Sequence, residues 1–328
     1  MHDSIQIRRF MATMQEYAVL ASIGASTPPQ YALDYEYHNA DDWRALDATF
    51  ARDGRPLLRY LAEVAGQMVA YAYYFEIAWA PPQGRYWCVI RVLPAYQRRG
   101  IGARLYTRLL DDLAQRGAAA MWLELDDTLT ALAPALERRG FRELLHSWAF
   151  ALDPRACDLA PFTTAYERLG GLQISTLAAD LARGADWLPP LHDLYVSVAG
   201  DVPIPIHPHP APSPEWLAQQ AIGLPESLPE AFIIVRDGRR YVGMSYLHAD
   251  ADPWRLFQRV TAVHPAYRGR GIALVLKLKT IEYALRHGCH EIRTAVESNN
   301  PGMLAINHKL GFAQREGLAL LEKSLRAS

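Results

Sequence analysis

The chain has few cysteines, no long apolar run and almost no net charge. Its three cysteines, Cys88, Cys157 and Cys289, are an odd number without a CxxC spacing, which argues against a disulfide framework and a structural zinc site. Nowhere do about 18 apolar residues follow one another, so no transmembrane helix is expected. The start, MHDSIQIRRF, lacks the apolar core of a signal peptide. These absences predict a protein of the reducing cytoplasm.

The formal net charge of -1 provides no overall positive field to hold a polyanion. We therefore expect neither nucleic acid nor an anionic membrane as the main partner. A hydrophobic fraction of 50% and a charged fraction of 21% are typical of a globular protein. Because domains usually contain about 100 to 200 residues, a chain of 328 residues predicts two of them.

One sequence motif occurs twice. The segments VLPAYQRRGIG at 92–102 and VHPAYRGRGIA at 263–273 are spaced by 171 residues, and the same spacing relates the Gly-Phe pair at 140–141 to the pair at 311–312. A register that holds without a gap over this length predicts a tandem duplication. We place the boundary near residue 155, which gives domains 1–155 and 156–328.

Each copy has the pattern of an α+β domain. Aromatic and β-branched runs separated by turn residues predict successive strands, and apolar residues at helical spacing predict helices. In the first copy we expect strands at 56–66, 67–79, 85–94, 118–126 and 141–153, and helices at 99–115 and 129–139. In the second copy we expect strands within 231–263 and at 291–297, and helices at 271–287 and 301–310. This order predicts, in each domain, a mostly antiparallel mixed sheet with one βαβ crossover and flanking helices.

The repeated motif lies where a strand turns through a glycine- and arginine-rich loop into a helix. Backbone N–H groups at such a helix start point to one position, and Gly100, Gly269 and Gly271 let a ligand approach the backbone closely. A phosphate group fits this position. The loop has neither the GK[ST] of an ATP-binding loop nor the GxGxxG of a dinucleotide site.

The pattern V-x-P-x-Y-[QR]-x-R-G-[IL]-[GA] resembles the acetyl-CoA pyrophosphate motif of the GNAT superfamily of N-acetyltransferases. The KLGF at 309–312 resembles the closing motif of that family, and the tandem arrangement is similar to that of mycothiol-synthase-like proteins. The resemblance covers residues 58–152 and 230–323. It implies two tandem GNAT-like domains that use acetyl-CoA as co-substrate without a metal, and it suggests the primary amine of a small molecule as acceptor.

The resemblance also implies which residues bind acetyl-CoA. Main-chain N–H groups of the loop would bind the pyrophosphate, and Val92 and Val263 would lie where the strand meets the pantetheine and thioester. The loop residues are Gln97, Arg98, Arg99, Gly100, Ile101 and Gly102 in the first copy, and Arg268, Gly269, Arg270, Gly271, Ile272 and Ala273 in the second.

Two asparagines distinguish the second copy. Relatives often carry an Asn that touches CoA at the position of Asn300, and many have a Tyr that protonates the leaving thiolate at the position of Asn307. The counterparts in the first copy are Leu129 and Leu136, which cannot donate a proton. Helix capping is the alternative for Asn300, and a solvated helix face is the alternative for Asn307. We expect the second domain to be catalytic and the first to be a degenerate copy that still has an intact acetyl-CoA loop.

The general base is not assigned by the resemblance. Some relatives have a Glu six positions before the motif Val, where this chain has Tyr86 and Phe257. Glu297, at the end of the last core strand, is our candidate for a base acting through water, and a solvated charge is its alternative. Its counterpart Asp126 is also acidic.

Acetyl transfer to a small amine through a ternary complex is thus the expected function. The alternatives are an acyl-CoA-binding regulatory protein without turnover and a protein acetyltransferase acting on a lysine or an N-terminus. The proline-rich segment 201–214 is expected to be an extended connector or a wall of the substrate cleft. The amine, the acyl chain preference and the oligomeric state stay open.

Overall fold

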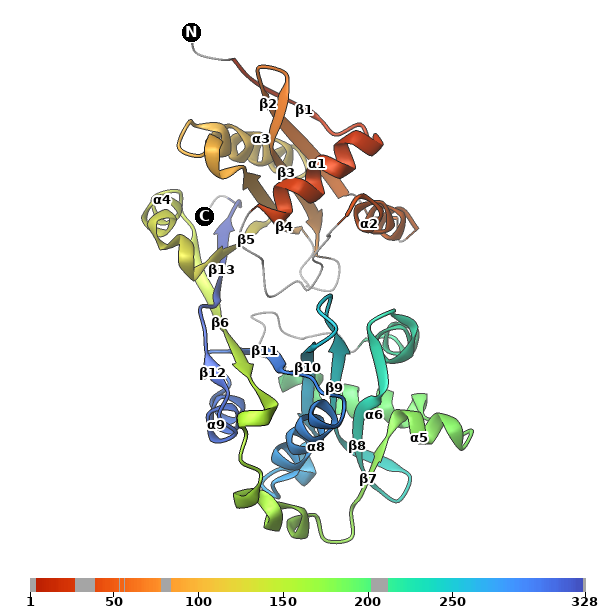
Figure 1. The fold of residues 1–328 in the computed structure, drawn as a ribbon. Helices are drawn as coiled ribbons and strands as arrows, with labels where there is room; N and C mark the ends of the chain where they lie inside the picture. Colours follow the sequence, from red (N-terminus) through yellow and green to blue (C-terminus); the bar gives the residue numbers. More distant parts are fainter. Residues whose placement is uncertain are drawn as a thin grey trace. The chain divides into compact units, whose positions relative to one another are not determined.

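A computed structural model describes residues 4–26, 39–52, 54–55, 57–77, 84–201 and 212–326. The chain divides into two compact units: unit 1 is Met1–Ser147 with Glu316–Ser328, and unit 2 is Trp148–Arg315 (Figure 1). Most of the proline-rich segment 201–214 lies outside the described residues. In the parts described, no helix combines the length and the apolar character that a membrane span requires.

Unit 1 is built on a sheet in the order β1-β2-β3-β4-β5-β13-β6. All neighbours with a described register are antiparallel except β4 and β5, which are parallel. The strands are β1 (Ile5–Arg9), β2 (Leu57–Val64), β3 (Gln67–Glu76), β4 (Arg85–Val92), β5 (Ala120–Asp126), β6 (Arg142–Leu152) and β13 (Leu318–Ser324). The helices are α1 (Met14–Ala25), α2 (Ala40–Arg52), α3 (Ile101–Gln115) and α4 (Ala133–Glu137).

The two faces of this sheet carry different helices. Helix α3 packs Leu105 and Leu109 into the core on one face, as its predicted apolar periodicity requires. Helices α1 and α2 lie on the other face (Figure 1). There Trp43 of α2 makes edge contacts with the rings of Tyr71 and Tyr73 on β3. Because side chains alternate along a strand, the tyrosines at 71 and 73 point away from α3.

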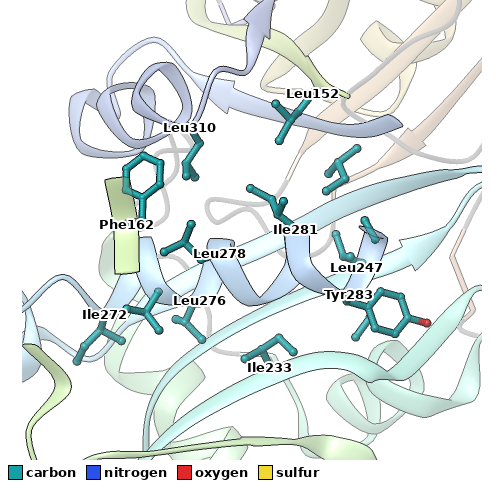
Figure 2. Close-up of a cluster of buried hydrophobic side chains, with 14 of the residues drawn as sticks. Leu152, Phe162, Ile233, Leu247, Ile272, Leu276, Leu278, Ile281, Tyr283 and Leu310 are labelled. Carbon is teal, nitrogen blue, oxygen red and sulfur yellow. The ribbon is translucent and has the colours of Figure 1, made fainter. Parts of the chain in front are cut away.

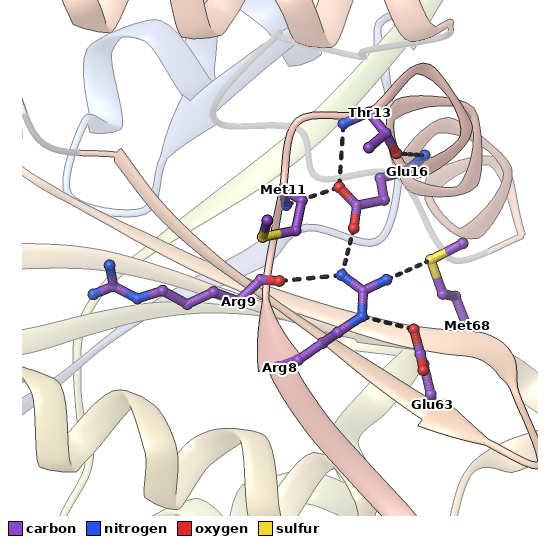
Figure 3. A network of polar contacts seen from close by, with 7 residues as sticks. All are labelled: Arg8, Arg9, Met11, Thr13, Glu16, Glu63 and Met68. Atoms are coloured by element: carbon purple, nitrogen blue, oxygen red, sulfur yellow. Dashed lines mark hydrogen bonds and ion pairs between the residues drawn. The ribbon is translucent and has the colours of Figure 1, made fainter.

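Arg8 on β1 holds the start of α1 in place (Figure 3). Its Nε donates to Glu63 Oε1 on β2 at 2.8 Å, and its Nη1 donates to Glu16 Oε1. Glu16 also accepts from the Met11 backbone N–H at 2.8 Å and forms a capping box with Thr13. One buried carboxylate therefore connects the first strand to the first helix.

Strand β13 completes unit 1. It pairs antiparallel with β5 on one side, through Leu321↔Leu123, and with β6 on the other, through Leu320↔Leu145. The units differ from the predicted domains 1–155 and 156–328 in two respects: the division falls after Ser147, and Glu316–Ser328 groups with unit 1. Residues 316–328 group with unit 1 because β13 pairs with the edge of β5 that β4 does not occupy.

Unit 2 contains the last part of β6 followed by β11-β10-β9-β8-β7, and β12 pairs with β6. Strands β10 and β11 are its parallel pair. The strands are β7 (Gln173–Thr176), β8 (Ser227–Asp237), β9 (Arg240–Ala249), β10 (Arg255–Val263), β11 (Glu291–Glu297) and β12 (Ala313–Gln314). The helices are α5 (Leu177–Ala182), α6 (Leu188–Val198), α7 (Pro214–Ala218), α8 (Ile272–Arg286) and α9 (Pro301–Lys309). Both units confirm the α+β class.

The core of unit 2 forms around α8. Leu276 and Ile281 of this helix are fully buried, and they belong to one cluster with Leu247 of β9. Figure 2 shows Leu278 on another side of α8, toward Phe162. Since α8 is apolar on several sides, it lies inside the unit rather than on its surface.

One predicted helix is shorter than expected. In place of a helix over 129–139, the chain makes a 3₁₀ turn at Asp127–Leu132 and then α4. Leu129 has non-helical angles, φ -105° and ψ 24°. The ring of Pro134 clashes with the carbonyl four residues earlier in an α-helix, so α4 does not extend back to Leu129.

Candidate functional site

The glycine loop has the same backbone course in both units. Gly100 and Gly271 are the N-caps of α3 and α8, with φ of 82° and 79°. Two residues earlier, Arg98 has a φ of 63° and Gly269 has a φ of 76°. Glycine adopts this left-handed region freely, whereas an arginine there is strained. The strain at Arg98 was not predicted, because sequence patterns place only glycine in this region.

Each loop presents unpaired backbone donors at the start of a long helix. The first intrahelical bonds run from Arg104 N–H to Gly100 O and from Val275 N–H to Gly271 O, both at 3.1 Å. The three amides before each of these donors have no acceptor in the helix, and a glycine N-cap has no side chain to offer one. They belong to Ile101, Gly102 and Ala103 in unit 1 and to Ile272, Ala273 and Leu274 in unit 2. This donor set fits a pyrophosphate.

Side chains of the loop brace it against its own unit. Gln97 Nε2 donates to Val92 O and Arg268 Nε donates to Val263 O, each at 3.1 Å. Arg268 also pairs with Asp201, and Arg270 Nη2 donates to the Leu169 carbonyl at 3.2 Å. These two loop arginines of unit 2 are thus engaged by protein oxygens.

The parallel strands part beside each loop. Pairing of β4 with β5 ends at Trp87↔Trp122, and pairing of β10 with β11 ends at Phe257↔Arg293, although all four strands continue. In unit 2 the His264 N–H donates to the Val242 carbonyl of β9 at 2.9 Å. Because successive N–H groups of a strand point to opposite sides, the N–H of Val263 points into the opening between β10 and β11. The bond from Leu93 N–H to Val69 O gives Val92 the same orientation in unit 1.

Strand β10 contains a bulge beside this opening. Its pairing with β9 shifts between Gln258 and Val260, which leaves Arg259 as the extra residue. In unit 1, β3 and β4 pair without a shift from Ala70↔Val92 to Glu76↔Tyr86. The bulge therefore distinguishes the two units at the strand next to the loop.

A buried polar network lies under the bulge. Lys277 of α8 is 1% exposed, and its Nζ donates to Gln258 Oε1 at 2.7 Å. Gln258 Nε2 donates to Ser245 Oγ at 2.7 Å and to Thr280 Oγ1 at 3.2 Å, and Thr294 Oγ1 donates to the Gln258 carbonyl at 3.1 Å. Burial lowers the pKa of Lys277 to about 7. The sequence analysis did not predict this network. Lys277 and Thr280, three residues apart on an apolar face of the helix, were a signal for a buried polar pair.

The two asparagines of α9 have different environments. Asn300 Oδ1 accepts from the Met303 N–H at 3.2 Å, so this residue is the helix N-cap. Asn307 is 0% exposed, and neither polar atom of its side chain has a hydrogen-bond partner among the described residues. This burial excludes a solvated helix face. An unsatisfied buried amide costs about 1–3 kcal/mol, which a ligand with its own amide groups, such as pantetheine, would offset.

Glu297 lies on the sheet face opposite α8. It shares this face with Arg293, because side chains alternate along β11 and Ile292 belongs to the α8 core. Within the described part of the chain, no side chain forms a hydrogen bond or an ion pair with its carboxylate, and burial raises the pKa of Glu297. Its counterpart Asp126 instead accepts from the Thr128 N–H at 2.8 Å as the cap of a 3₁₀ turn. Of these two acidic residues, which the sequence did not distinguish, Asp126 caps a turn in unit 1, whereas the Glu297 carboxylate interacts with its own backbone N–H in unit 2.

The model of the acetyltransferase (GNAT) family matches this chain twice, at residues 20–141 and 199–312. The chain belongs to this family, which confirms the resemblance inferred from the two glycine motifs. A solved GCN5-related N-acetyltransferase from Sphaerobacter thermophilus has a TM-score of 0.67 at 17% identity, over 99% of this chain and 96% of that one. A tandem GNAT protein from the clavulanic acid biosynthesis pathway has the same TM-score at 18% identity, over 99% and 100%. These two likenesses show the fold.

Curated relatives match shorter segments. The [ribosomal protein bS18]-alanine N-acetyltransferase of Escherichia coli is 43% identical over 54 residues, which is 16% of this chain and 36% of that protein. The L-methionine sulfoximine/L-methionine sulfone acetyltransferase of Salmonella typhimurium is 35% identical over 72 residues, or 20% of this chain and 42% of that protein. The chain thus spans well under half the length of these relatives.

Proposed function

We propose that unit 2 transfers the acetyl group of acetyl-CoA to the primary amine of a small molecule, directly and without a covalent enzyme intermediate. The observation that carries this proposal is the opening between β10 and β11. It has the uncapped amides of the α8 loop at one end and the carboxylate of Glu297, which no described side chain pairs, on the far face of the sheet. A thioester and an amine can therefore meet between the two strands.

In this proposal the residues of unit 2 divide the binding of acetyl-CoA among them. The amides of Ile272 and Ala273 hold the pyrophosphate, and the N–H of Val263 donates to the thioester oxygen, where negative charge develops during transfer. Asn307 supplies an amide to the pantetheine or to the departing sulfur, which fits its unpartnered buried atoms. Acetyl-CoA supplies the activated acetyl group.

Glu297 is the proposed base, acting through a water molecule. It takes a proton from the amine, the amine nitrogen bonds to the acetyl carbon, and the bond from that carbon to sulfur breaks. The released thiolate takes a proton from Asn307-bound or bulk water. Burial brings the pKa of Glu297 toward neutral pH, where a carboxylate is a better base.

The acceptor class is supported by the relatives. One acts, by its name, on methionine sulfoximine or sulfone, and the other on the alanine of a ribosomal protein. The second is named an N-acetyltransferase, and the first is named for small molecules. Free Cys88, Cys157 and Cys289 support a reducing cytoplasm as the place of action.

Steady-state thiol release from acetyl-CoA over a panel of small amines tests the proposal, with wild type compared to Gly271→Glu and Gly100→Glu. Both changes place a side chain and a negative charge at equivalent left-handed caps. We expect Gly271→Glu to lower kcat/KM about 100-fold, which equals about 2.7 kcal/mol. Gly100→Glu should leave turnover near the wild-type value.

The other outcomes are equally specific. Loss only in Gly100→Glu would assign catalysis to unit 1. Binding of CoA without release of thiol from any amine would favour the regulatory protein. Turnover of lysine or N-terminal peptides in preference to every small amine would favour a protein acetyltransferase. Circular dichroism of each variant must first match that of the wild type.

A further inference from the structure

The sheet face of unit 1 opposite α3 carries aromatic and charged side chains beside the opening between β4 and β5. Arg59 on β2 is in register with Tyr73 on β3. The rings of Trp87 and Trp122, the last paired residues of β4 and β5, contact each other at a centroid distance of 6.2 Å. Glu124 follows two residues later on β5, so its side chain lies on the same face at the edge of the opening.

Several buried polar atoms of this face have no hydrogen-bond partner among the described residues. They are the acceptor Glu124 Oε2 and the donors Trp87 Nε1, Arg59 Nε and Arg59 Nη2. Trp87 is 6% exposed and Arg59 is 5% exposed. Polar groups this deeply buried are nearly always paired, so each unpaired one calls for a partner, either an ordered water or a bound ligand. The face thus lacks both a donor, for Glu124, and an acceptor, for the tryptophan.

A second arginine stands beside Glu124. Arg91 on β4 interacts electrostatically with the Glu124 carboxyl and hydrogen-bonds Tyr71. Trp87 and Arg91 lie on one face of β4, four residues apart, with Glu124 across the opening. The arginine disfavours a divalent cation next to this carboxylate, and it favours a ligand that carries its own negative group.

Unit 2 lacks this combination. At the spacing of 171 residues the counterparts of Glu124 and Arg91 are Ala295 and Ala262. Arg91 pairs with Tyr71 of β3 as Ala262 pairs with Met244 of β9, so unit 2 keeps a tyrosine, Tyr246, at the place of Tyr73 but has no charged pair there. The expectation of a degenerate first copy depended on Leu129 and Leu136. Unit 1 thus has leucines at the positions of both asparagines, but it has charged groups on the sheet face opposite α3.

We propose that this face of unit 1 binds a zwitterion of the apolar amino acid class. The ammonium group contacts Glu124, the carboxylate contacts Arg91 and Trp87 Nε1, and the apolar side chain lies against the aromatic rings of Trp122 and Tyr73. The proposal does not rest on acetyl transfer by unit 2, because it concerns binding in the other unit.

Binding should release a proton. Burial raises the pKa of Glu124 to about 8, against the lowering effect of Arg91. Among the described residues, the other charged or titratable groups of this face include Tyr71 and Tyr73 on β3 and Arg59 on β2, which is paired with Asp47 of α2. Glu322 of β13 is paired with Trp122 and Arg142. The ammonium needs an ionised carboxylate, so the Kd should be about fivefold higher at pH 7 than at pH 8. Calorimetry in buffers of different ionisation enthalpy measures the released proton.

The test is isothermal titration of the full chain with L-leucine, L-methionine and L-phenylalanine. Each amino acid is compared with the amine that lacks its carboxylate and with the acid that lacks its ammonium. We expect at least one amino acid to bind more tightly than both of its analogues. In Glu124→Gln this amino acid should bind no better than its acid analogue, and the proton release should disappear.

Two variants serve as controls. Glu143→Gln, at an exposed position of β6, should bind like the wild type. Glu297→Gln should also retain binding, because Glu297 belongs to unit 2. Absence of binding by all three amino acids would overturn the proposal, and so would loss of binding in Glu297→Gln but not in Glu124→Gln. Neither result would bear on thiol release in Gly271→Glu, so the two proposals fail separately.

Discussion

Lys277 lies in the core of unit 2, where its ammonium group stands 4.7 Å from the centre of the Phe312 ring. In the described part of the chain, its ammonium group donates to the side chain of Gln258 through Oε1. An ammonium group in such surroundings is held mainly by this bond and the ring, and burial lowers its pKa from 10.5 to about 7. The folded protein therefore binds this proton less tightly than the unfolded chain does.

This difference predicts a pH-dependent stability. Between about pH 7 and 10.5 the unfolded chain keeps the proton that the folded protein has released, so the free energy of unfolding should rise with pH in this window. Lys277→Met should remove this part of the rise. Urea denaturation from pH 6 to 9.5 measures it, with Lys279→Met, on the same helix and partly exposed, as the control. An unchanged slope in Lys277→Met would show that another group is responsible.

Glu124 should change the free energy of unfolding with pH in the opposite direction. Its folded pKa of about 8 lies above the ordinary value of 4.5, so its contribution should lower the free energy of unfolding as the pH rises from 4.5 to 8. Glu124→Gln should therefore raise the melting temperature more at pH 8 than at pH 5. Thermal unfolding at the two pH values checks this, and an equal shift at both would contradict the raised pKa.

Sequence reasoning about single residues succeeded where backbone geometry decides the residue type. Gly100 and Gly271 were singled out because they let a ligand approach the backbone, and the structure adds that both have the left-handed conformation that favours glycine. Lys277 and Glu124 were missed because a charged residue in an apolar pattern reads as a break in that pattern. Only the structure shows what surrounds it.

At the scale of elements, α9 combines a cap and a proposed ligand contact at one residue. Asn300→Ala removes the acceptor of the Met303 N–H, which should lower the free energy of unfolding by about 1 kcal/mol. If Asn300 also touches CoA, the KM for acetyl-CoA should rise. Asn300→Asp keeps the cap and removes the amide, so it should keep the stability while the KM still rises. A normal KM in both variants would leave Asn300 as a cap alone.

Strands and long helices were predicted well because their patterns are local. The apolar face of α3 and the aromatic and β-branched runs of β2, β3 and β4 can be read over a few residues. The bulge at Arg259 could not be predicted, since it depends on pairing with β9. The shortened α4 depends on a single proline within a helical pattern.

At the scale of the whole molecule, β13 should control the stability of unit 1. It buries Leu318 and Leu321, and its Glu322 accepts from Trp122 Nε1 at 2.9 Å. Removal of residues 316–328 should expose the amides of β5 and β6 to hydrogen exchange, while the amides of α8 and β9 in unit 2 stay protected. Exchange measured by mass spectrometry would show this, and full protection of β5 in the shortened chain would contradict it.

A single substitution in β13 tests the contribution of its core packing while the strand itself is kept. Leu321→Asn keeps β13 but places a polar group in the core, so unit 1 should lose about 2–5 kcal/mol, as in large core truncations. Glu316→Gln, at an exposed position just before the strand, is the matched control. The sequence analysis predicted no strand over 318–324, and it could not have shown the neighbours of β13, because pairing between distant strands leaves no local pattern.

The position of β13 in the chain has a consequence for biosynthesis. All of unit 2, residues 148–315, leaves the ribosome before this strand does. During that interval β5 has one edge without its final partner, and such an edge can pair with strands of other chains. A chaperone that shields exposed strands would bind the growing chain during this interval. Unit 1, whose synthesis begins first, is therefore the later of the two units to complete its sheet.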